Sequence, residues 1–561
     1  MKGDFIINYV WNTQGTAKTV SEILNYIMKE RNFTKQQMLD YLKNIPPYNN
    51  AMLFKNMDKI ISKIKKAIKE DKKIYIFGDY DSDGVNATYI LYRALKFLGA
   101  NVYYKLPHRL KDGYGIQEKS ILQMQKDGAE LIITVDNGIA SIDAINKAIE
   151  LGIEIIVTDH HQPQEQLPNC LFLDAHVPGS NYPFLDLCGA GVAFKLASVL
   201  IDDFENCEIY NDLLVSATIG TISDVMPIYG ENRRIIIDGL RLINNGYNIG
   251  IQKLLEVLNL DGKEIDSGTI GFKIGPCINA AGRLDTPLHS LNLLLSDDDY
   301  SALKYANKLN DLNEKRKTIQ KEIAQNIDVD NDNKVIISTI DGKIAGIAGI
   351  LASNIAEKYM KPCFIFHNDK TKCIGSARTF GNFPVIECLN KSRDIIISGG
   401  GHNAACGLAI TPEMLPKFQE SCNNVFNEWI EQNPDGLIQE LFSTCEIYDF
   451  DVITEKLINN INKLKPFGEG NPEPIFITKD VNVENIRIVG KNKNVIQFVC
   501  EKNFRKIKCV GFESFMKKFE ECKNPKNIDI MYKVGINEFP AGIKNVQLTL
   551  IDFKVRRSYY E

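Results

Sequence analysis

The stretch IYIFGDYDSDG, residues 74–84, decides the fold of this 561-residue chain. Four apolar residues are followed by a glycine, by three aspartates spaced two residues apart, and then by the helix-like run VNATYILYRALKFL. The same rhythm returns in LIITVDNG (131–138) and in IEIIVTDHH (153–161). Apolar strands that alternate with helices are typical of a parallel sheet covered on both faces. We therefore predict a doubly wound α/β domain.

Outward from this stretch, the chain is too long for a single hydrophobic core and divides into several segments. Residues 1–52 form an expected N-terminal helical segment, with Thr34 and Gln37 as a capping box. The other expected segments are the α/β domain at 53–232, a helical connector at 233–328, a smaller α/β domain at 329–433, and a strand-rich β-barrel at 434–561.

The composition, 44% hydrophobic and 24% charged, is typical of a folded globular chain. The start of the sequence lacks a secretory apolar run, and no stretch has membrane-spanning length. We therefore expect a cytoplasmic protein with no membrane association. The 13 cysteines include no CxxC pair, which argues against a structural zinc site.

Charge is distributed unevenly along the chain. The net charge is -5, yet residues 481–561 contain 16 basic and 9 acidic residues. A basic end on an acidic body fits a surface that binds a polyanion. It equally fits a solvated basic face on an ordinary domain, and charge alone does not separate the two interpretations.

Acidic and imidazole side chains follow three consecutive strands of the predicted sheet. They are Asp79, Asp81 and Asp83 after the first strand, Asp136 after the second, and Asp159, His160 and His161 after the third. Each Asp taken alone equally fits a helix N-cap or a turn. Because strand carboxyl ends line one crevice, the three clusters together predict a cation site, which Asp224 after LLVSATIGTI can complete. Oxygen ligands with little imidazole favour Mg²⁺ or Mn²⁺ over zinc.

The set GDYDSDG, TVDNG, TDHH and TISDV, in this order, resembles the four motifs of the DHH phosphoesterases, which hydrolyse phosphate esters with two Mn²⁺ or Mg²⁺ ions. The resemblance implies one ion held by Asp81 and Asp136, and a second held by Asp83, Asp136, His160 and Asp224, with Asp79 assisting. It also implies that His161 faces the scissile phosphate and that His161 and Asp136 are catalytic. Phe77 departs from the pattern, because many members carry a His at that position.

Other segments resemble the RecJ family within this superfamily: LPHRLKDGYG (106–115), LCGAGVAFKL (187–196), GENR (230–233), INAAGRLD (278–285) and PFGEGNPEPIF (466–476). This resemblance implies a DHH-associated domain, an OB-fold as the final barrel, and a 5′-to-3′ exonuclease of single-stranded DNA that acts in repair and recombination. It also implies work beside a helicase and a single-strand binding protein. We expect a monomer, because one chain supplies both walls of the cleft.

The same resemblance assigns residues to the substrate. Arg109, Arg283, Ser376 and Arg378 are expected to contact it, with an arginine fork gripping a 5′ phosphate. Gly400, Gly401 and His402 are expected to approach a phosphate, although a glycine cluster also fits a tight turn. Phe498 and Phe504 fit base stacking or the barrel core, and for each we favour the core. Cys277 and residues 340–350 depart from the family pattern.

Two other functions stay open from the sequence. A DHH enzyme that acts on short oligonucleotides or cyclic dinucleotides has the same four motifs, but it needs no basic barrel. A non-catalytic DNA-binding relative has the barrel, but it does not need the full set of acidic ligands.

Overall fold

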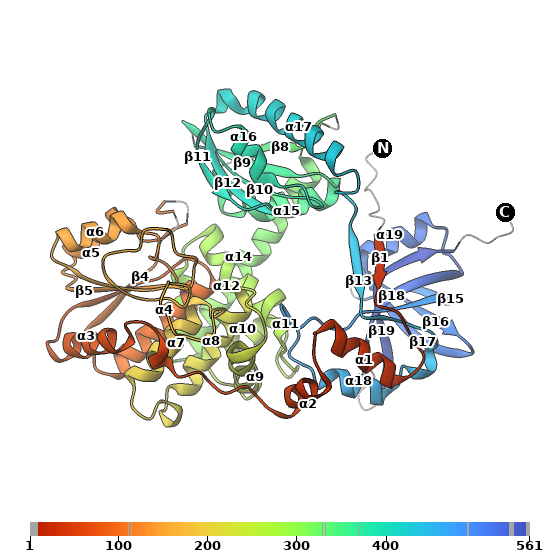
Figure 1. Ribbon diagram of the computed structural model, residues 1–561, viewed down its shortest axis with the longest axis horizontal. Helices are drawn as coiled ribbons and strands as arrows, with labels where there is room; N and C mark the ends of the chain where they lie inside the picture. Colours follow the sequence, from red (N-terminus) through yellow and green to blue (C-terminus); the bar gives the residue numbers. More distant parts are fainter. Residues whose placement is uncertain are drawn as a thin grey trace. The chain divides into compact units, whose positions relative to one another are not determined.

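The structure is a computed structural model, and it describes residues 9–556 except 110, 114, 328, 331, 341, 370, 491–492 and 538–543. The chain forms two compact units (Figure 1). The larger unit contains Pro46–Gln432 and Gly468–Gly470, and the smaller unit contains Met1–Ile45, Asn433–Phe467 and Asn471–Glu561.

A five-stranded sheet opens the larger unit. Its order is β4-β3-β5-β6-β7, and every neighbouring pair is parallel. The strands are β3 (Ile74–Phe77), β4 (Val102–Lys105), β5 (Leu131–Val135), β6 (Glu154–Thr158) and β7 (Leu171–Leu173). Side chains alternate along β3, so that Ile74 and Ile76 belong to one core and Tyr75 and Phe77 to another.

Helices supply both cores. On one side lie η1 (Ala51–Leu53), α3 (Met57–Lys69), α4 (Ser82–Phe97) and α7 (Gly189–Leu200), and on the other lie α5 (Glu118–Lys126) and α6 (Ile142–Glu150). Strands β3 and β5 are buried along their whole length. The predicted doubly wound α/β sheet is confirmed.

Further helices pack on the α4 side and share its core. They are η2 (Phe204–Asn206), α8 (Tyr210–Ser223), α9 (Gly230–Asn244), α10 (Ile249–Val257), α11 (Ser267–Thr269), η3 (Ile270–Ile274), α12 (Gly275–Leu284), α13 (Leu288–Leu294) and α14 (Asp299–Asn326). Segment η3 is a π-helix. One hydrophobic core is continuous from the sheet to Leu312. The expected domain boundary between residues 232 and 233 therefore stays a prediction.

A second, mixed sheet completes the larger unit, in the order β11-β12-β10-β9-β8. Its strands are β8 (Ile336–Ile340), β9 (Cys363–Asp369), β10 (Lys372–Arg378), β11 (Ile396–Gly401) and β12 (Ala405–Ile410). The accompanying helices are η4 (Gly342–Ile347), α15 (Ala348–Tyr359), α16 (Val385–Lys391), η5 (Pro412–Met414) and α17 (Leu415–Gln432). Only the pair β8–β9 is parallel among the described pairings of this sheet.

A closed barrel forms most of the smaller unit. Its strands are β15 (Phe476–Val489), β16 (Val495–Lys502), β17 (Arg505–Phe512), β18 (Asn527–Asn537) and β19 (Asn545–Val555). They follow the order β16-β17-β19-β18-β15, and pairing of β15 with β16 closes the ring. Around it lie β13 (Glu440–Ser443), β14 (Cys445–Ile447), η6 (Phe450–Val452), α18 (Glu455–Asn462) and α19 (Glu513–Glu521). The predicted C-terminal β-barrel is confirmed.

The N-terminal segment joins this barrel unit. Helices α1 (Val20–Glu30) and α2 (Lys35–Lys43) are present, and Thr34 and Gln37 form the expected capping box. Two short strands were not predicted: β1 (Val10–Thr13) pairs in parallel with β13, and β2 (Thr16–Ala17) pairs in parallel with β14. Among the described residues, no helix is both long and apolar enough to cross a membrane.

Candidate metal centre and phosphate pocket

The carboxyl edge of the parallel sheet gathers the residues predicted to bind metal. They are Asp79 after β3, Asp136 after β5, His160 and His161 after β6, Asp81 and Asp83 at the start of α4, and Asp224 at the end of α8. Three subsets have potential ligand atoms within 4.8 Å of one another: Asp79, Asp81 and Asp136; Asp83, His160 and Asp224; Asp136, His160 and His161. All seven predicted residues therefore lie in one cluster.

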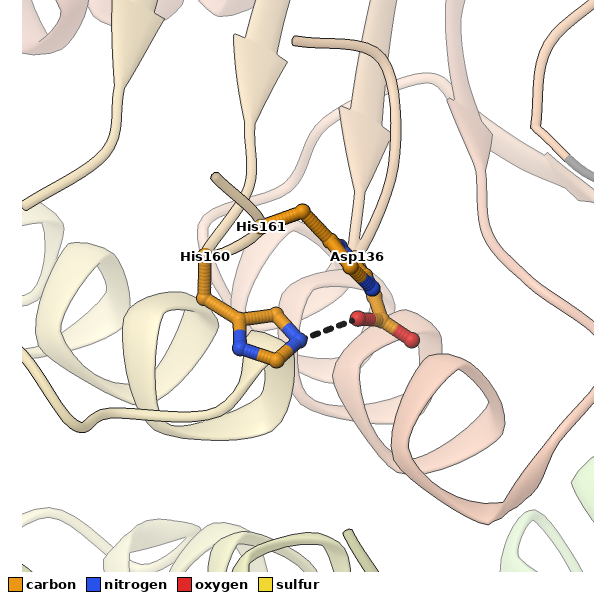
Figure 2. A group of neighbouring side chains, drawn as sticks. All are labelled: Asp136, His160 and His161. Atoms are coloured by element: carbon orange, nitrogen blue, oxygen red, sulfur yellow. Dashed lines mark ion pairs between the residues drawn. The ribbon is translucent and has the colours of Figure 1, made fainter. Parts of the chain in front are cut away.

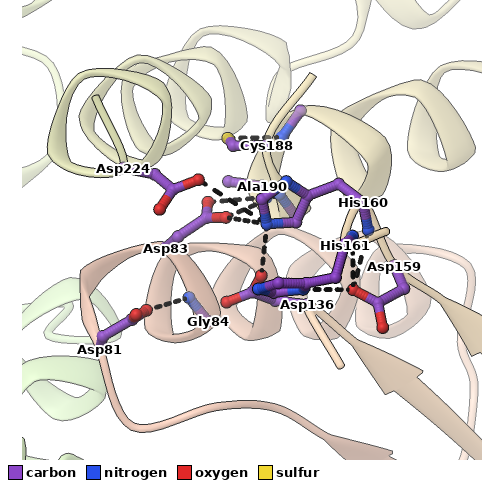
Figure 3. A network of polar contacts seen from close by, with 12 residues as sticks. Asp81, Asp83, Gly84, Asp136, Asp159, His160, His161, Cys188, Ala190 and Asp224 are labelled. Carbon is purple, nitrogen blue, oxygen red and sulfur yellow. Dashed lines mark hydrogen bonds and ion pairs between the residues drawn. The ribbon is translucent and has the colours of Figure 1, made fainter. Parts of the chain in front are cut away.

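His160 contacts three of the carboxylates. Its Nε2 lies 3.0 Å from Oδ1 of Asp136 (Figure 2). The same atom lies 3.7 Å from the Oδ2 atoms of both Asp83 and Asp224 (Figure 3). Burial lowers the pKa of His160, which favours the neutral imidazole. A neutral imidazole is the form that coordinates a metal ion.

The carboxylates lie so close together that bound cations would stabilise them. Burial, and then the charge of neighbouring carboxylates, raises the pKa of Asp79 and of Asp224 to about 8. Asp79 Oδ1 and Asp224 Oδ2 are buried and have no hydrogen-bond partner among the described residues. Because buried polar atoms are normally paired, these oxygens fit as metal ligands. Carboxylate oxygens with one or two imidazoles suit Mn²⁺ or Mg²⁺.

The backbone at Asp136 is adapted to this crowding. Asp136 has a φ of 62°, a left-handed conformation that Asp and Asn tolerate better than most residues. Gly189, at the start of α7, faces it: a Cβ there would lie 2.4 Å from Cβ of Asp136. The glycine in LCGAG therefore leaves the space that the carboxylate occupies.

Hydrogen bonds from α7 hold Asp83 in place. Its carboxylate accepts a hydrogen bond from the backbone N–H of Gly189 at 2.6 Å. It accepts another from the backbone N–H of Ala190 at 2.9 Å (Figure 3). An anion at a helix N-terminus is also favoured by the helix dipole. Asp83 is thus fixed before any cation binds.

Asp159 orients His161. Its carboxylate accepts hydrogen bonds from the backbone N–H groups of Ile139, His160 and His161. Its Oδ1 lies 2.7 Å from Nδ1 of His161 (Figure 3). Although burial opposes it, this contact raises the pKa of His161 to about 9. Burial alone would raise the pKa of Asp159, but the hydrogen bond from His161 lowers it. Nδ1 of His161 is therefore engaged with Asp159.

One acidic residue near the centre was missed by sequence reasoning. Asp174 follows β7 as the other aspartates follow their strands, and it accepts a hydrogen bond from the backbone of His176 at 2.8 Å. Burial raises the pKa of Asp174 to about 7. The repeated pattern of an apolar run followed by Asp, here LFLD, was the available signal, but three residues are a short strand to detect.

A second site lies beside the carboxylates. Arg109, Arg283, Ser376 and Arg378 line one pocket of about 250 Å³, and no described residue that lines it is acidic. Burial, and then the charge of Arg109, lowers the pKa of Arg283 to about 10. Guanidinium groups in a pocket whose described lining contains no acid suit an anion such as phosphate.

Tyr80 links this pocket to the metal centre. The guanidinium carbon of Arg109 lies 4.8 Å from the centroid of the Tyr80 ring, and Tyr80 stands between Asp79 and Asp81 in sequence. The positive charge of Arg109 is one of the influences that lower the pKa of both aspartates, against burial. The arginine pocket and the carboxylate cluster are therefore neighbours.

Gly400, Gly401 and His402 lie apart from this pocket. Gly400 and Gly401 belong to the edge strand β11, and the backbone N–H of His402 donates to Ala405 in the turn that leads to β12. All three are exposed, and none lines the arginine pocket. Their role in substrate binding stays a prediction.

The departures from the family pattern fall in different surroundings. Phe77 and Cys277 are fully buried, and Cys277 Sγ lies 3.2 Å from Nδ2 of Asn313. Of residues 340–350, Asp341 lies outside the described residues, while Gly346 and Gly349 line the arginine pocket. The Gly346 carbonyl accepts a hydrogen bond from Arg283 at 3.3 Å. The altered segment is therefore a wall of the pocket itself.

The parallel sheet, its aspartate and histidine centre, and the second mixed sheet define a protein of the DHH class. Family models agree: the DHH family N-terminal domain matches residues 73–221, the DHHA1 domain residues 332–428, and the RecJ OB domain residues 447–552. The chain belongs to the RecJ family.

Relatives with these features are known from sequence and structure. The single-stranded-DNA-specific exonuclease RecJ of Bacillus subtilis is 34% identical over 510 residues, which are 89% of this chain and 64% of that protein. A manganese-bound exonuclease RecJ is 31% identical over 67% of this chain and 96% of its own, with a TM-score of 0.59. RecJ of Thermus thermophilus in complex with Mn²⁺ shares the fold, with a TM-score of 0.80 at 24% identity, over 98% of this chain and 80% of that one.

Proposed function

We propose that this protein is a metal-dependent 5′-to-3′ exonuclease that hydrolyses phosphodiester bonds of single-stranded DNA. The observation that carries the proposal is the adjacency of two sites of opposite charge. A cluster of aspartates with His160 can hold cations, and an arginine pocket beside it can hold a phosphate. The names of the similar proteins support DNA as the polymer and a single strand as its form.

Each ligand has a proposed place in the centre. We assign Asp81 and Asp136 to one ion and Asp83, Asp136, His160 and Asp224 to the other, with Asp79 in support. Divalent ions bound there would supply an acidified water and would offset negative charge at the phosphate. Asp136 belongs to both sets, which fits its central position among the ligand groups.

His161 is proposed to face the scissile phosphate. Its Nδ1 is engaged by Asp159, so the imidazole is held in one orientation. The elevated pKa of His161 favours a protonated ring, which can donate a hydrogen bond to a phosphate oxygen. Asp159 acts through His161 as a positioning residue.

The arginine pocket is proposed to bind the 5′-terminal phosphate. A planar guanidinium matches phosphate geometry, and three of them line this pocket with Ser376. With the terminal phosphate held there and the next phosphate at the neighbouring metal centre, hydrolysis would release one nucleotide at a time from the 5′ end.

The test uses an end-labelled single strand with a 5′ phosphate, supplied with Mn²⁺ or Mg²⁺. Parallel reactions contain a duplex, an RNA strand, a dinucleotide and a strand whose only free end is 3′. Metal-dependent release of mononucleotides from the 5′ end is the expected result. Hydrolysis of dinucleotides but not of long DNA would reassign the protein to short substrates, and no hydrolysis of any substrate would indicate a non-catalytic relative.

The working form is proposed to be a monomer, because one chain forms both the carboxylate cluster and the arginine pocket. A helicase and a single-strand binding protein are the proposed partners, since each delivers single-stranded DNA. Because the proposed substrate is cellular DNA, we propose that the protein acts in the cytoplasm.

A further inference from the structure

The turn between β16 and β17 contains an aromatic residue in an unfavourable position. Lys502 pairs with Arg505, so Asn503 and Phe504 alone form the loop. Their φ angles are 49° and 65°, both positive as a type I′ hairpin turn requires. Asn tolerates this conformation, but the second position favours glycine, and a bulky residue there is strained. Phe504 therefore occupies a site where glycine would fold more easily.

Phe504 also gains nothing from burial. It is 96% exposed, whereas Phe498 on the preceding strand is fully buried. Packing thus compensates neither the strain nor the exposed apolar surface of Phe504. The sequence-based preference for a core position is correct for Phe498 and wrong for Phe504.

The turn is held firmly despite its exposure. Asn503 Nδ2 donates to Oδ2 of Asp449 at 2.6 Å, and Arg505 Nη2 donates to the carbonyl of Ile453 at 3.3 Å. Both acceptors flank η6, so the base of the turn is fastened to the body of the unit. The ring of Phe504 is presented to solvent on a fixed support.

Cationic residues flank Phe504 in the sequence. The segment KNFRKIK, residues 502–508, contains four cations and no acid. Lys502 contacts Asp480 at 3.6 Å, and Lys506 contacts Glu484 and Glu501 at 2.7 and 3.4 Å. Exposed ion pairs of this kind are weak, so phosphates can compete for these lysines. Lys508 is exposed two residues further along the same face of the strand.

We propose that Phe504 is a stacking platform for one nucleobase of a single-stranded nucleic acid, with the adjacent cations contacting the flanking phosphates. An exposed ring among cations fits an unpaired base and its backbone, because every base has a face that can stack. A duplex hides those faces, so the platform selects single strands without reading their sequence. This inference rests on the proposed single-stranded substrate and adds a contact on the smaller unit.

The test measures binding of a 5′-phosphorylated single strand to the full chain with Asp136→Asn, which keeps the strand intact. Phe504→Leu retains an apolar side chain but lacks an aromatic face, and it is expected to weaken binding by about 5- to 150-fold, the range for loss of one stacked base. Phe504→Trp is expected to restore binding. Tyr300→Leu, which removes an 81% exposed aromatic from α14 of the larger unit, is the matched control and should bind like the parent.

A fluorescent base analogue distinguishes stacking of a base on residue 504 from binding of the strand without stacking. A strand that carries 2-aminopurine should lose fluorescence on binding to the parent and to Phe504→Trp, but much less on binding to Phe504→Leu. Phe504→Gly guards against misfolding, because glycine accepts the turn without strain and should preserve or raise the melting temperature.

Equal binding by the parent, Phe504→Leu and Phe504→Gly would overturn the inference, even where the wild-type chain degrades DNA normally. Failure of the wild-type chain to cleave a single strand that it binds through Phe504 would overturn only the proposed exonuclease function. Absence of binding by the parent would overturn both.

Discussion

The metal centre and the β16–β17 turn are proposed to contact the substrate by opposite physical means. In the centre, Asp79, Asp83 and Asp136 are at most 3% exposed, and helix N–H groups or tight glycine contacts fix their surroundings. At the turn, the ring of Phe504 is 96% exposed, and Lys502, Arg505 and Lys506 lie within two residues of it in the sequence. Hydrolysis at one phosphate needs ligands that are already in position before the substrate binds. Binding single-stranded DNA of any sequence needs only a surface on which every base can stack.

The largest expected effect comes from removing one charge in the metal centre. Asp136→Asn should lower exonuclease activity by at least about 100-fold, since even groups that only support metal ligands contribute about 10- to 100-fold. Asn accepts the φ of 62°, so the variant should fold. Single-turnover rates measure the loss.

Asp203→Asn is the matched control for that variant. Asp203 is exposed and also has a positive φ, of 52°, so the chemical change and the backbone conformation are the same. Wild-type activity is expected. A comparable loss in both variants would show that the backbone conformation, rather than the metal centre, accounts for the effect.

A smaller effect is expected from Asp159→Asn, which removes the charge that orients His161. Activity should fall by about 10- to 100-fold, mostly in kcat. KM and the thermal shift produced by Mn²⁺ should change little, because Asp159 is proposed to hold His161 and not the cations. A lost Mn²⁺ response in this variant would instead make Asp159 a ligand.

Arg378→Lys tests the phosphate pocket. Lysine keeps the positive charge but cannot form the bidentate contact with phosphate. The rate of cleavage of a 5′-phosphorylated strand should therefore fall by about 10-fold, consistent with a charge-assisted hydrogen bond of about 1.5–3 kcal/mol. A strand with a 5′ hydroxyl should show little difference. The control is Arg393→Lys, which changes an exposed arginine between α16 and β11, next to the same mixed sheet. Equal losses on both strand ends would argue against recognition of the terminal phosphate.

In a thermal unfolding experiment, metal binding should stabilise the larger unit and leave the unfolding transition of the barrel unit unchanged. At a Mn²⁺ concentration 100 times the dissociation constant, the larger unit should gain about 2.7 kcal/mol of stability. The barrel unit contains none of the metal-ligand groups found among the described residues, so its transition should not move. A chelator should reverse the gain, and Asp224→Asn should reduce it. Equal shifts of both transitions would contradict a site confined to the larger unit.

Much of the metal centre was predictable because the signal is local. Asp79, Asp136 and Asp159 come at most two residues after a buried strand, and the carboxyl ends of parallel strands must meet at one edge. The arginine pocket was identified only through family resemblance, because Arg109 and Arg378 are brought together by tertiary packing that no local pattern encodes. The role of Asp159 depends on side-chain hydrogen bonds, which a motif does not reveal.

The barrel unit shows where the sequence is less informative. Strands β1 and β2 have four and two residues, and their partners lie more than 400 positions away in the sequence. Such pairings leave no periodic signal of their own. Phe498 and Phe504 are equally apolar in the sequence, and only the turn geometry places one inside the barrel and the other in solvent.

The smallest expected effect concerns Val225, the larger unit's counterpart to Phe504. This β-branched residue follows Asp224, has a φ of 57°, and is 65% exposed, so neither its backbone nor its burial favours valine. Val225→Gly should therefore raise stability by about 1 kcal/mol, the usual cost of a left-handed conformation in a residue with a Cβ. Val10→Gly in β1, which has no such strain to relieve, should lower it. Denaturant unfolding gives both values, and a destabilised Val225→Gly would show that valine packs favourably beside the metal centre. A gain in stability together with reduced exonuclease activity would indicate that strain at the end of α8 helps to orient Asp224, as the strained turn at Phe504 is proposed to present its ring to the DNA strand.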